Sequence, residues 1–591
     1  MIELKIKTEV LSKIILMLLI SFQYSCKDDF LKVLPKGVLN ENNMINSSGV
    51  NTTLIAAYSL LDQTGGVGSG NGISGSNWVF GGVTSDEAVK GSSLGDLQDI
   101  NTIETFRLNS AITLLNNQWR VLYDGVQRAN DVIRLVSKVR DEDMSPMEKT
   151  EALAEARFLR AHFHFQLKRI FNNISFIDET VTYQNNNFNV PNDVDAYPRI
   201  EDDLRFADYN LPNTQTSIGR VNKWAAKAYL GKVYLYEHKF SEARFELDSV
   251  ISFGVNTSGV KFKLLQNYGN NFNADFNDNS ETVFAVKFSV NDGSSNANNG
   301  NRGDRLNGPY NWANIHASGF YQPTQSLVNS FRVDDQGLPY LNTFDDIDVK
   351  NDQGLTSDQP FVPDNTTLDP RLDWTVGRRG IPYLDWGVFP GNNAIREQSS
   401  GGPYDCVKTT YRKSQTGINS DATAQYGTYS NINYCIIRYS DVLLMAAEAE
   451  IEEGNLERAR ELTNIVRARA ANPVSWVYKY IDDNNPANGF SNTPAANYKV
   501  GLYDNFPNAD YARKAVRFER KLEFGMEGRR FFDLVRYGTV SEEMNKFFNK
   551  AKLMHSYYNG VIFTSGKNEY MPIPQVQIDL SKGILVQNEG Y

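Results

Sequence analysis

Three loop segments combine aromatic side chains with planar polar ones. Tryptophan and tyrosine rings can stack on the C–H face of a sugar, while carboxylate, amide and guanidinium groups can bind its hydroxyls. The segments are therefore candidates for binding a polyhydroxylated ligand, although burial as a loop anchor is an equal alternative for any one ring. Trp312 is the strongest candidate, because its neighbours are Asn, Gly, Pro and Tyr and it belongs to no apolar stripe. The candidates are Asn77, Trp78 and Asp86; Arg305, Asn307, Tyr310, Asn311 and Trp312; and Arg379, Tyr383, Asp385 and Trp386, a loop that can fold against Tyr404.

The sequence gives little support for a catalytic or metal centre. Acidic residues lie among arginines between Tyr511 and Tyr537, but neighbouring arginines lower a carboxyl pKa, whereas a proton donor needs a raised one. Structural ion pairs are the preferred interpretation. His162 and His164, two residues apart on a predicted helix, point to different faces and form no metal site. We predict no enzymatic activity, metal or cofactor; a glycoside hydrolase, which needs two carboxylates across a cleft, is the less favoured alternative.

Two stretches resemble known binding motifs but do not meet their requirements. Gly70 to Gly75 fits the G-x-G-x-x-G pattern, but more glycine and Ser-Asn-Trp flank it instead of the strand and helix of a nucleotide site, so we predict a flexible surface loop. Residues 271–281 resemble a calcium loop, yet Phe276 stands at the glycine position and Thr282 at that of the bidentate glutamate. An Asx-rich turn is the better interpretation.

Charge and the N-terminus restrict the class of protein. A net charge of -10 without a Lys/Arg block argues against nucleic acid as a partner. Lysines followed by the apolar run from Ile14 to Phe22, too short to span a bilayer, predict a lipoprotein signal at residues 1–25 and lipidation of Cys26. An ordinary cleaved signal with a spare cysteine is the less favoured alternative. Residues 26–45 are then the anchor and an extended tether. Cys406 and Cys435 can form one disulfide, although their spacing does not require it.

Two helical pairs organise the remaining chain. Residues 436–471 predict two helices joined at Gly454, with the small residues Ala447 and Ala459 twelve positions apart. The same separation recurs between Gly231 and Ala243 in residues 223–251. Small residues at these offsets resemble the tetratricopeptide helix pair, which buries its core by stacking on neighbours. Further helices are predicted at residues 49–61, 116–139, 145–171, 197–211 and 511–537.

The stretch between the two pairs, residues 253–435, is long and irregular, with short strand-like runs such as Thr282 to Val290. Loops of this length in a compact protein are usually functional. Together, the predicted helices and this insertion indicate one mainly α-helical domain at residues 46–591. Its helical scaffold spans about 46–252 and 436–591, and its ligand-binding insertion spans about 253–435.

Several segments together resemble the SusD/RagB outer-membrane nutrient-binding lipoproteins of Bacteroidetes, over nearly all of the mature sequence. Lys27-Asp28-Asp29 is similar to the tag that sends such lipoproteins to the outer cell surface. The other segments that carry the resemblance are Trp119 with Tyr123 and Asn130, Glu155 to Phe165, Asp369 to Leu372, Ile437 to Met445, Glu519-Arg520 with Asp533-Leu534, and the closing residues Gln587, Asn588, Gly590 and Tyr591.

The resemblance implies a non-enzymatic lipoprotein, anchored in the outer membrane and facing the cell exterior. It implies capture of a nutrient, usually a glycan, and delivery to a SusC-like TonB-dependent transporter over which the protein acts as a lid. Peptide or another cargo is the alternative within the family, and a protein-docking adaptor that uses its concave helical surface is another. Because the shared motifs mark the scaffold, ligand residues do not follow from the resemblance.

Overall fold

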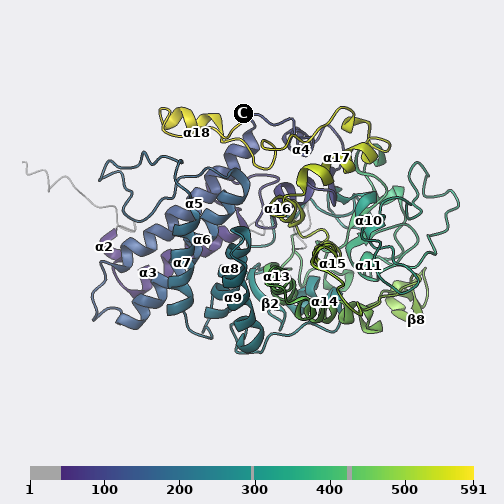
Figure 1. Cartoon of the computed structure of the whole chain (residues 1–591), viewed down its shortest axis with the longest axis horizontal. Helices are drawn as coiled ribbons and strands as arrows, with labels where there is room; N and C mark the ends of the chain where they lie inside the picture. The colour runs from purple at the N-terminus through teal and green to yellow at the C-terminus, as the bar shows by residue number, and fades with distance from the viewer. Residues whose placement is uncertain (1–40, 295–298, 422–428) are drawn as a thin grey trace, which may run out of the picture.

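The computed structural model describes residues 41–294, 299–421 and 429–591 (Figure 1). The predicted signal, Cys26 and the tether as far as residue 40 lie outside this part of the chain. Glu41–Met44 forms the short helix α2, so the expected extended tether is wrong for these residues. No helix among the described residues is long and apolar enough to cross a bilayer.

Helices stacked side by side form one half of the molecule (Figure 1). Their starts follow local signals: Asn46 caps α3, and Ser145 forms the predicted capping box with Glu148 at the start of α6. Each helix packs on the next in the series, with α3 against α5 and α6. The bounds are α3 Ser47–Tyr58, α5 Thr113–Val136, α6 Pro146–Phe171, α7 Tyr197–Asn210, α8 Lys223–Tyr236 and α9 Phe240–Phe253.

The second predicted helix pair continues this stack. It consists of α13 Tyr439–Glu452 and α14 Leu456–Ala471, and α13 packs directly against α9. Gly231 shows why a small residue is needed at the crossing of α8 and α9, since a Cβ there would lie 2.8 Å from the Leu247 side chain. The two pairs, about two hundred residues apart in sequence, therefore form one scaffold.

The insertion between the pairs contains short strands in two-stranded antiparallel sheets. β2 (Thr282–Val286) pairs with β6 (Tyr434–Arg438) and joins the two ends of the insertion beside the scaffold. β1 (Ala88–Gly91) pairs with β3 (Phe320–Pro323) and ties the N-terminal region to the insertion. β4 (Val376–Gly377) pairs with β5 (Asp405–Cys406) within the insertion. Outside it, after α14, β7 (Tyr478–Tyr480) pairs with β8 (Phe490–Pro494). Short helices complete these regions: α4 Gln98–Glu104, α10 Gln325–Ser330, α11 Arg371–Thr375 and α12 Gln398–Gly401.

The surface loop that we expected at Gly70 to Gly75 is only partly exposed, because Gly70 and Asn71 are exposed whereas Gly72, Ile73 and Ser74 are buried. Residues 77–91 are buried, and Trp78–Val83 forms a π-helix. Its glycines allow backbone contact rather than mobility, because a Cβ at Gly81 would lie 1.9 Å from the carbonyl oxygen of Gly528. This segment is part of the main hydrophobic core.

The predicted helix 511–537 is two helices, α15 Ala509–Phe524 and α16 Arg530–Arg536. The break contains Gly525 and Gly528, the latter with a φ of +65°. The charged side chains form buried ion pairs as predicted: Arg520 contacts Asp441 at 2.7 Å and Asp533 at 3.0 Å, and Arg371 contacts Glu519 at 2.6 Å. The chain closes with α17 Val540–Ala551 and α18 Gln575–Leu580.

Candidate functional site

The first predicted loop does not offer its side chains to a ligand. Trp78 is 1% exposed, and its Nε1 donates to the carbonyl of Gly303 at 3.2 Å. Asn77 is also buried and donates to Gln166. The Asp86 carboxylate is buried between Lys521 Nζ and Arg530 Nε, each at 2.8 Å. Burial alone would raise the pKa of Asp86, but the two cations hold it well below its usual range. The expectation of exposed ligand contacts is therefore wrong for this loop.

The aromatic residues of the third loop are interior as well. The Tyr383 hydroxyl donates to the carbonyl of Cys406, and Trp386 Nε1 donates to the carbonyl of Tyr411 at 2.7 Å. Tyr404 is buried and donates to Gln325. The expected proximity of the third loop and Tyr404 is confirmed, because β4 and β5 pair beside them. The prediction that these three rings are exposed for stacking on a ligand is, however, wrong.

Arg379 and Asp385 are half-buried, and they bind backbone groups. The guanidinium of Arg379 donates to the carbonyls of Ser357 at 2.8 Å and Thr356 at 3.2 Å. The carboxylate of Asp385 accepts from the amides of Lys413 at 2.6 Å and Ser414 at 3.0 Å. Both side chains therefore fix neighbouring loops in place.

Besides Arg379 and Asp385, four predicted residues are half-buried or exposed, and these four lie in one segment, residues 305–312. Arg305, Tyr310 and Trp312 are half-buried and Asn311 is exposed, whereas Asn307 is buried. We call Arg305, Tyr310, Asn311 and Trp312 the 305–312 site. The structure thus reduces three candidate loops to one.

The Trp312 ring is held by the aromatic residues beneath it. It lies edge-on to Tyr383 and Phe389, with a centroid separation of 5.6 Å in each case, and those two rings stack on each other. They belong to a second, smaller hydrophobic core within the insertion. The third loop thus supports Trp312 from below, and its packing keeps the indole in one orientation for a ligand.

Around Trp312 the backbone adopts unusual conformations. Asn311, Ala313 and Asn314 have φ values of 49°, 54° and 64°. Asparagine tolerates the left-handed region, but a single alanine there costs about 1–2 kcal/mol. Such strain is concentrated at functional sites, where the surrounding structure maintains it. The exposed Asn311 amide owes its position beside Trp312 to this conformation.

Arg396 contributes to the same surface and was not predicted. Its guanidinium carbon lies 5.2 Å from the centroid of Tyr310, and its Nη1 contacts Asp96 at 2.8 Å. Burial raises the pKa of Asp96, but hydrogen bonds from Ser93 and Ser92 and the charge of Arg396 outweigh this and lower it. The position of Arg396 in an Asn-rich stretch, GNNAIRE, was the available sequence signal.

Arg305 connects the site to the glycine-rich segment. Its Nη2 donates to Asn71 Oδ1 at 2.6 Å, and its guanidinium carbon lies 5.8 Å from the Tyr429 ring centroid. A planar cation fixed in this way can still present hydrogen-bond donors to hydroxyl groups. The site therefore has the ring, amide and guanidinium groups that recognition of a sugar requires.

The two candidate carboxylates have structural partners. Asp86 is paired with Lys521 and Asp385 binds backbone amides, so these two do not form the opposed pair of a glycosidase. The described residues also contain no cluster of three His, Cys, Asp or Glu side chains that could hold a metal ion.

The family models and the relative that match this chain agree with one another. Residues 280–591, just over half of the chain, match the model of the SusD family, and residues 38–235 match that of a family described as "Starch-binding associating with outer membrane". "SusD-like protein P2" of Formosa agariphila is 24% identical, over 84% of this chain and 86% of that protein.

Two similar solved structures confirm the fold. A "Laminarin binding SusD-like protein" has a TM-score of 0.65 and 24% identity, over 92% of this chain and 100% of the other. "Surface glycan-binding protein A" of Bacteroides thetaiotaomicron, in complex with laminarihexaose, has a TM-score of 0.64 and 18% identity, over 92% of this chain and 99% of the other.

Proposed function

Because the chain belongs to the SusD family, we propose that it is a non-enzymatic, glycan-binding lipoprotein on the outer face of the outer membrane. It captures an oligosaccharide at the 305–312 site and delivers it to a SusC-like TonB-dependent transporter. Lipidation of Cys26 supplies the anchor in this proposal. The names of the relatives, which include binders of laminarin and laminarihexaose, support a glycan as the cargo.

The observation that carries the proposal is the position of Trp312. Its ring is half-buried over a fixed aromatic layer, with the exposed Asn311 amide next to it and Tyr310 two residues away. Stacking of a pyranose on such a ring buries apolar surface, and the nearby amide binds the hydroxyls. Since the ring is already ordered, binding loses little side-chain entropy.

Affinity electrophoresis tests the proposed activity. The soluble chain, lacking residues 1–26, is run in gels that contain polysaccharides of a panel that includes laminarin and starch. We expect at least one polysaccharide to retard it. No retardation by any of them would contradict glycan capture and favour a peptide or another cargo.

Product analysis tests the claim that the protein is not an enzyme. The retained polysaccharide is incubated with the protein, and the chain length of the glycan is measured over time. We expect no change, whereas shortened products would show hydrolysis.

A further inference from the structure

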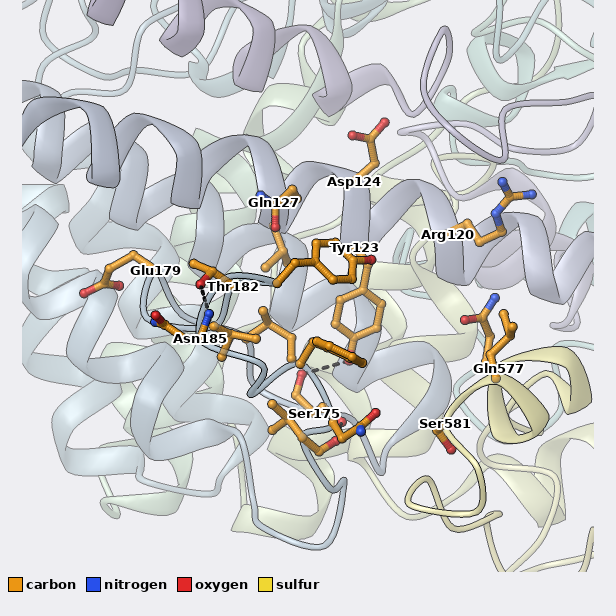
Figure 2. Close-up of a pocket in the computed structure, with 18 of the residues that line it drawn as sticks. Arg120, Tyr123, Asp124, Gln127, Ser175, Glu179, Thr182, Asn185, Gln577 and Ser581 are labelled. Atoms are coloured by element: carbon orange, nitrogen blue, oxygen red, sulfur yellow. Dashed lines mark hydrogen bonds between the residues drawn. The ribbon is translucent and has the colours of Figure 1, made fainter. Parts of the chain in front are cut away.

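A large groove lies on the helical half of the molecule, formed entirely by residues outside the insertion (Figure 2). Its volume is about 1390 Å³, and its walls are α5, residues 175–190 and the C-terminal segment that contains α18. Sites for single small ligands are usually about 300–1,000 Å³. The groove is therefore large enough for an extended chain of several units.

The floor of the groove is aromatic and rigid. Trp119 and Tyr123, on α5, contact each other with a centroid separation of 4.9 Å, and Trp119 packs edge-on against Phe171. The Tyr123 hydroxyl donates to the carbonyl of Ser175 at 2.8 Å, an interaction that Figure 2 shows at the centre of the groove. This bond fixes the ring and connects the floor to one wall.

Two further rings stand at the rim. Tyr183 is 84% exposed and Phe188 is 44% exposed, and their centroids lie 5.1 Å apart. Their loop is ordered by its own hydrogen bonds, from the amide of Asn185 to Thr182 Oγ1 and from the amide of Thr182 to Asn187 Oδ1. Large rings exposed beside a preformed groove indicate a binding surface rather than loose core residues.

The polar lining favours an uncharged ligand. Three cationic side chains, Arg120, Arg134 and Lys138, line the groove with three acidic ones, Asp124, Asp131 and Glu179. Arg134 and Asp131 also pair with each other at 2.6 Å. With the charges balanced, the groove gives no net attraction to an ion.

Amide side chains supply the remaining hydrogen-bonding groups. They come from all three lining segments and are Gln127, Gln184, Asn189 and Gln577. Figure 2 shows Gln127 and Gln577 on different sides of the groove. Each amide offers donors and an acceptor, which matches the dual character of hydroxyl groups. No strand lies among the lining residues, so an extended peptide has no strand edge with which to pair.

We propose that this groove is a second binding site for a neutral oligosaccharide, separate from the 305–312 site. The inference rests on the proposed function, because it assigns the groove to the same class of ligand. A long glycan that contacts both sites would be held at two places on the protein. Two sites joined in one protein raise the retention of a polymeric ligand above that of either site alone.

The test uses Tyr183→Ala/Phe188→Ala in the background of Trp312→Ala. The control in that background is Tyr209→Ala, because Tyr209 is 86% exposed on α7 and does not line the groove. Tyr183 and Tyr209 are highly exposed and Phe188 is 44% exposed, so neither the double substitution nor the control should prevent folding. Binding of a retained polysaccharide and of its oligosaccharides is measured by affinity electrophoresis and by calorimetry.

We expect Trp312→Ala to retain residual glycan binding. In that background, Tyr183→Ala/Phe188→Ala should weaken the residual binding about tenfold, and Tyr209→Ala should leave it unchanged. If Tyr183→Ala/Phe188→Ala binds as well as the control, the groove is not a glycan site, while the proposed function stands. If the rings in the groove account for all of the binding and Trp312→Ala has no effect, the second site is supported and the 305–312 site is refuted. Failure of the unsubstituted chain to bind any glycan overturns both.

Discussion

Substitution of Asp86 tests whether this residue has a structural role or a ligand-binding one. Asp86 was a candidate for contact with a glycan, yet its side chain is 3% exposed and pairs with Lys521 and Arg530, whose side chains are 1% and 11% exposed. Asp86→Asn keeps the shape of the side chain but removes the charge. It leaves two buried cations without their counter-ion, a change that costs about 3–5 kcal/mol in comparable buried pairs.

The loss of stability in Asp86→Asn depends on how Lys521 and Arg530 respond to removal of the negative charge. Burial already lowers the pKa of Lys521, against the opposing charge of Asp86. Without that charge, Lys521 loses its proton more readily, which relieves part of the cost and leaves Arg530 unpaired. We therefore expect a loss near the lower end, about 3 kcal/mol, at pH 7.

Urea denaturation followed by circular dichroism measures this effect, with Asp510→Asn as the matched control. Asp510 also contacts an arginine, Arg513, at 2.8 Å, but its side chain is 89% exposed, so its loss should cost less than about 1 kcal/mol. We expect the midpoint to fall for Asp86→Asn and to change little for the control, with glycan binding unaffected in both. An unchanged midpoint together with lost binding would refute the structural role.

The ion pairs of Asp86 also predict how the stability of the fold depends on pH. The folded-state pKa of Asp86 is lowered, so its stabilisation is complete above its unfolded value of about 3.9 and is lost as the pH falls through the folded value. The difference in stability between the unsubstituted chain and Asp86→Asn should therefore shrink below about pH 4. A difference that persists unchanged to lower pH would contradict this assignment.

Three further predictions concern other buried groups. Gly125→Ala places a Cβ 2.6 Å from the Phe163 ring where α5 crosses α6, so overpacking should destabilise the fold by about 1–3 kcal/mol; a raised melting temperature would contradict this crossing. Burial, followed by the charge of Asp86, raises the pKa of Glu87 to about 8, so its contribution to stability declines as the pH rises from about 4.5 to 8. Glu87→Gln should reduce that decline, and an unaltered pH profile would contradict a protonated Glu87. Cys406 and Cys435 are free, and burial raises the pKa of Cys406 to about 12. Thiol titration of the soluble chain should find two thiols in denaturant and slow reaction in the native state, whereas none in denaturant would indicate a disulfide.

The helical scaffold could be predicted because its signals are local. The Ser145 capping box, Gly454 with a φ of +83° and the spacing of small residues act within a few turns of chain. The break between α15 and α16 had a signal too, in Gly525 and Gly528, but the charged periodicity on either side concealed it. How the two helix pairs join, through the contact of α13 with α9, depends on residues far apart in sequence.

The site could be predicted only in part, because burial is set by distant contacts. Trp78 and Trp312 both lie in stretches rich in Gly and Asn. The neighbours of Trp312 favoured it as a ligand contact, but they did not establish that Trp78 is buried. Trp78 is buried through a partner 225 residues away, and Asp86 through one 435 residues away. The close approach of Gly81 to the carbonyl oxygen of Gly528 likewise joins residues far apart in sequence.

Calorimetric titration of Trp312→Ala with a retained oligosaccharide tests the claim that the Trp312 ring carries glycan binding. Trp224→Ala is the matched control, since Trp224 is another half-buried tryptophan, on α8 of the scaffold. We predict that Trp312→Ala weakens binding at this site by about tenfold or more while Trp224→Ala leaves it unchanged. Equal affinities for Trp312→Ala and the unsubstituted chain, with both proteins folded, would contradict the claim.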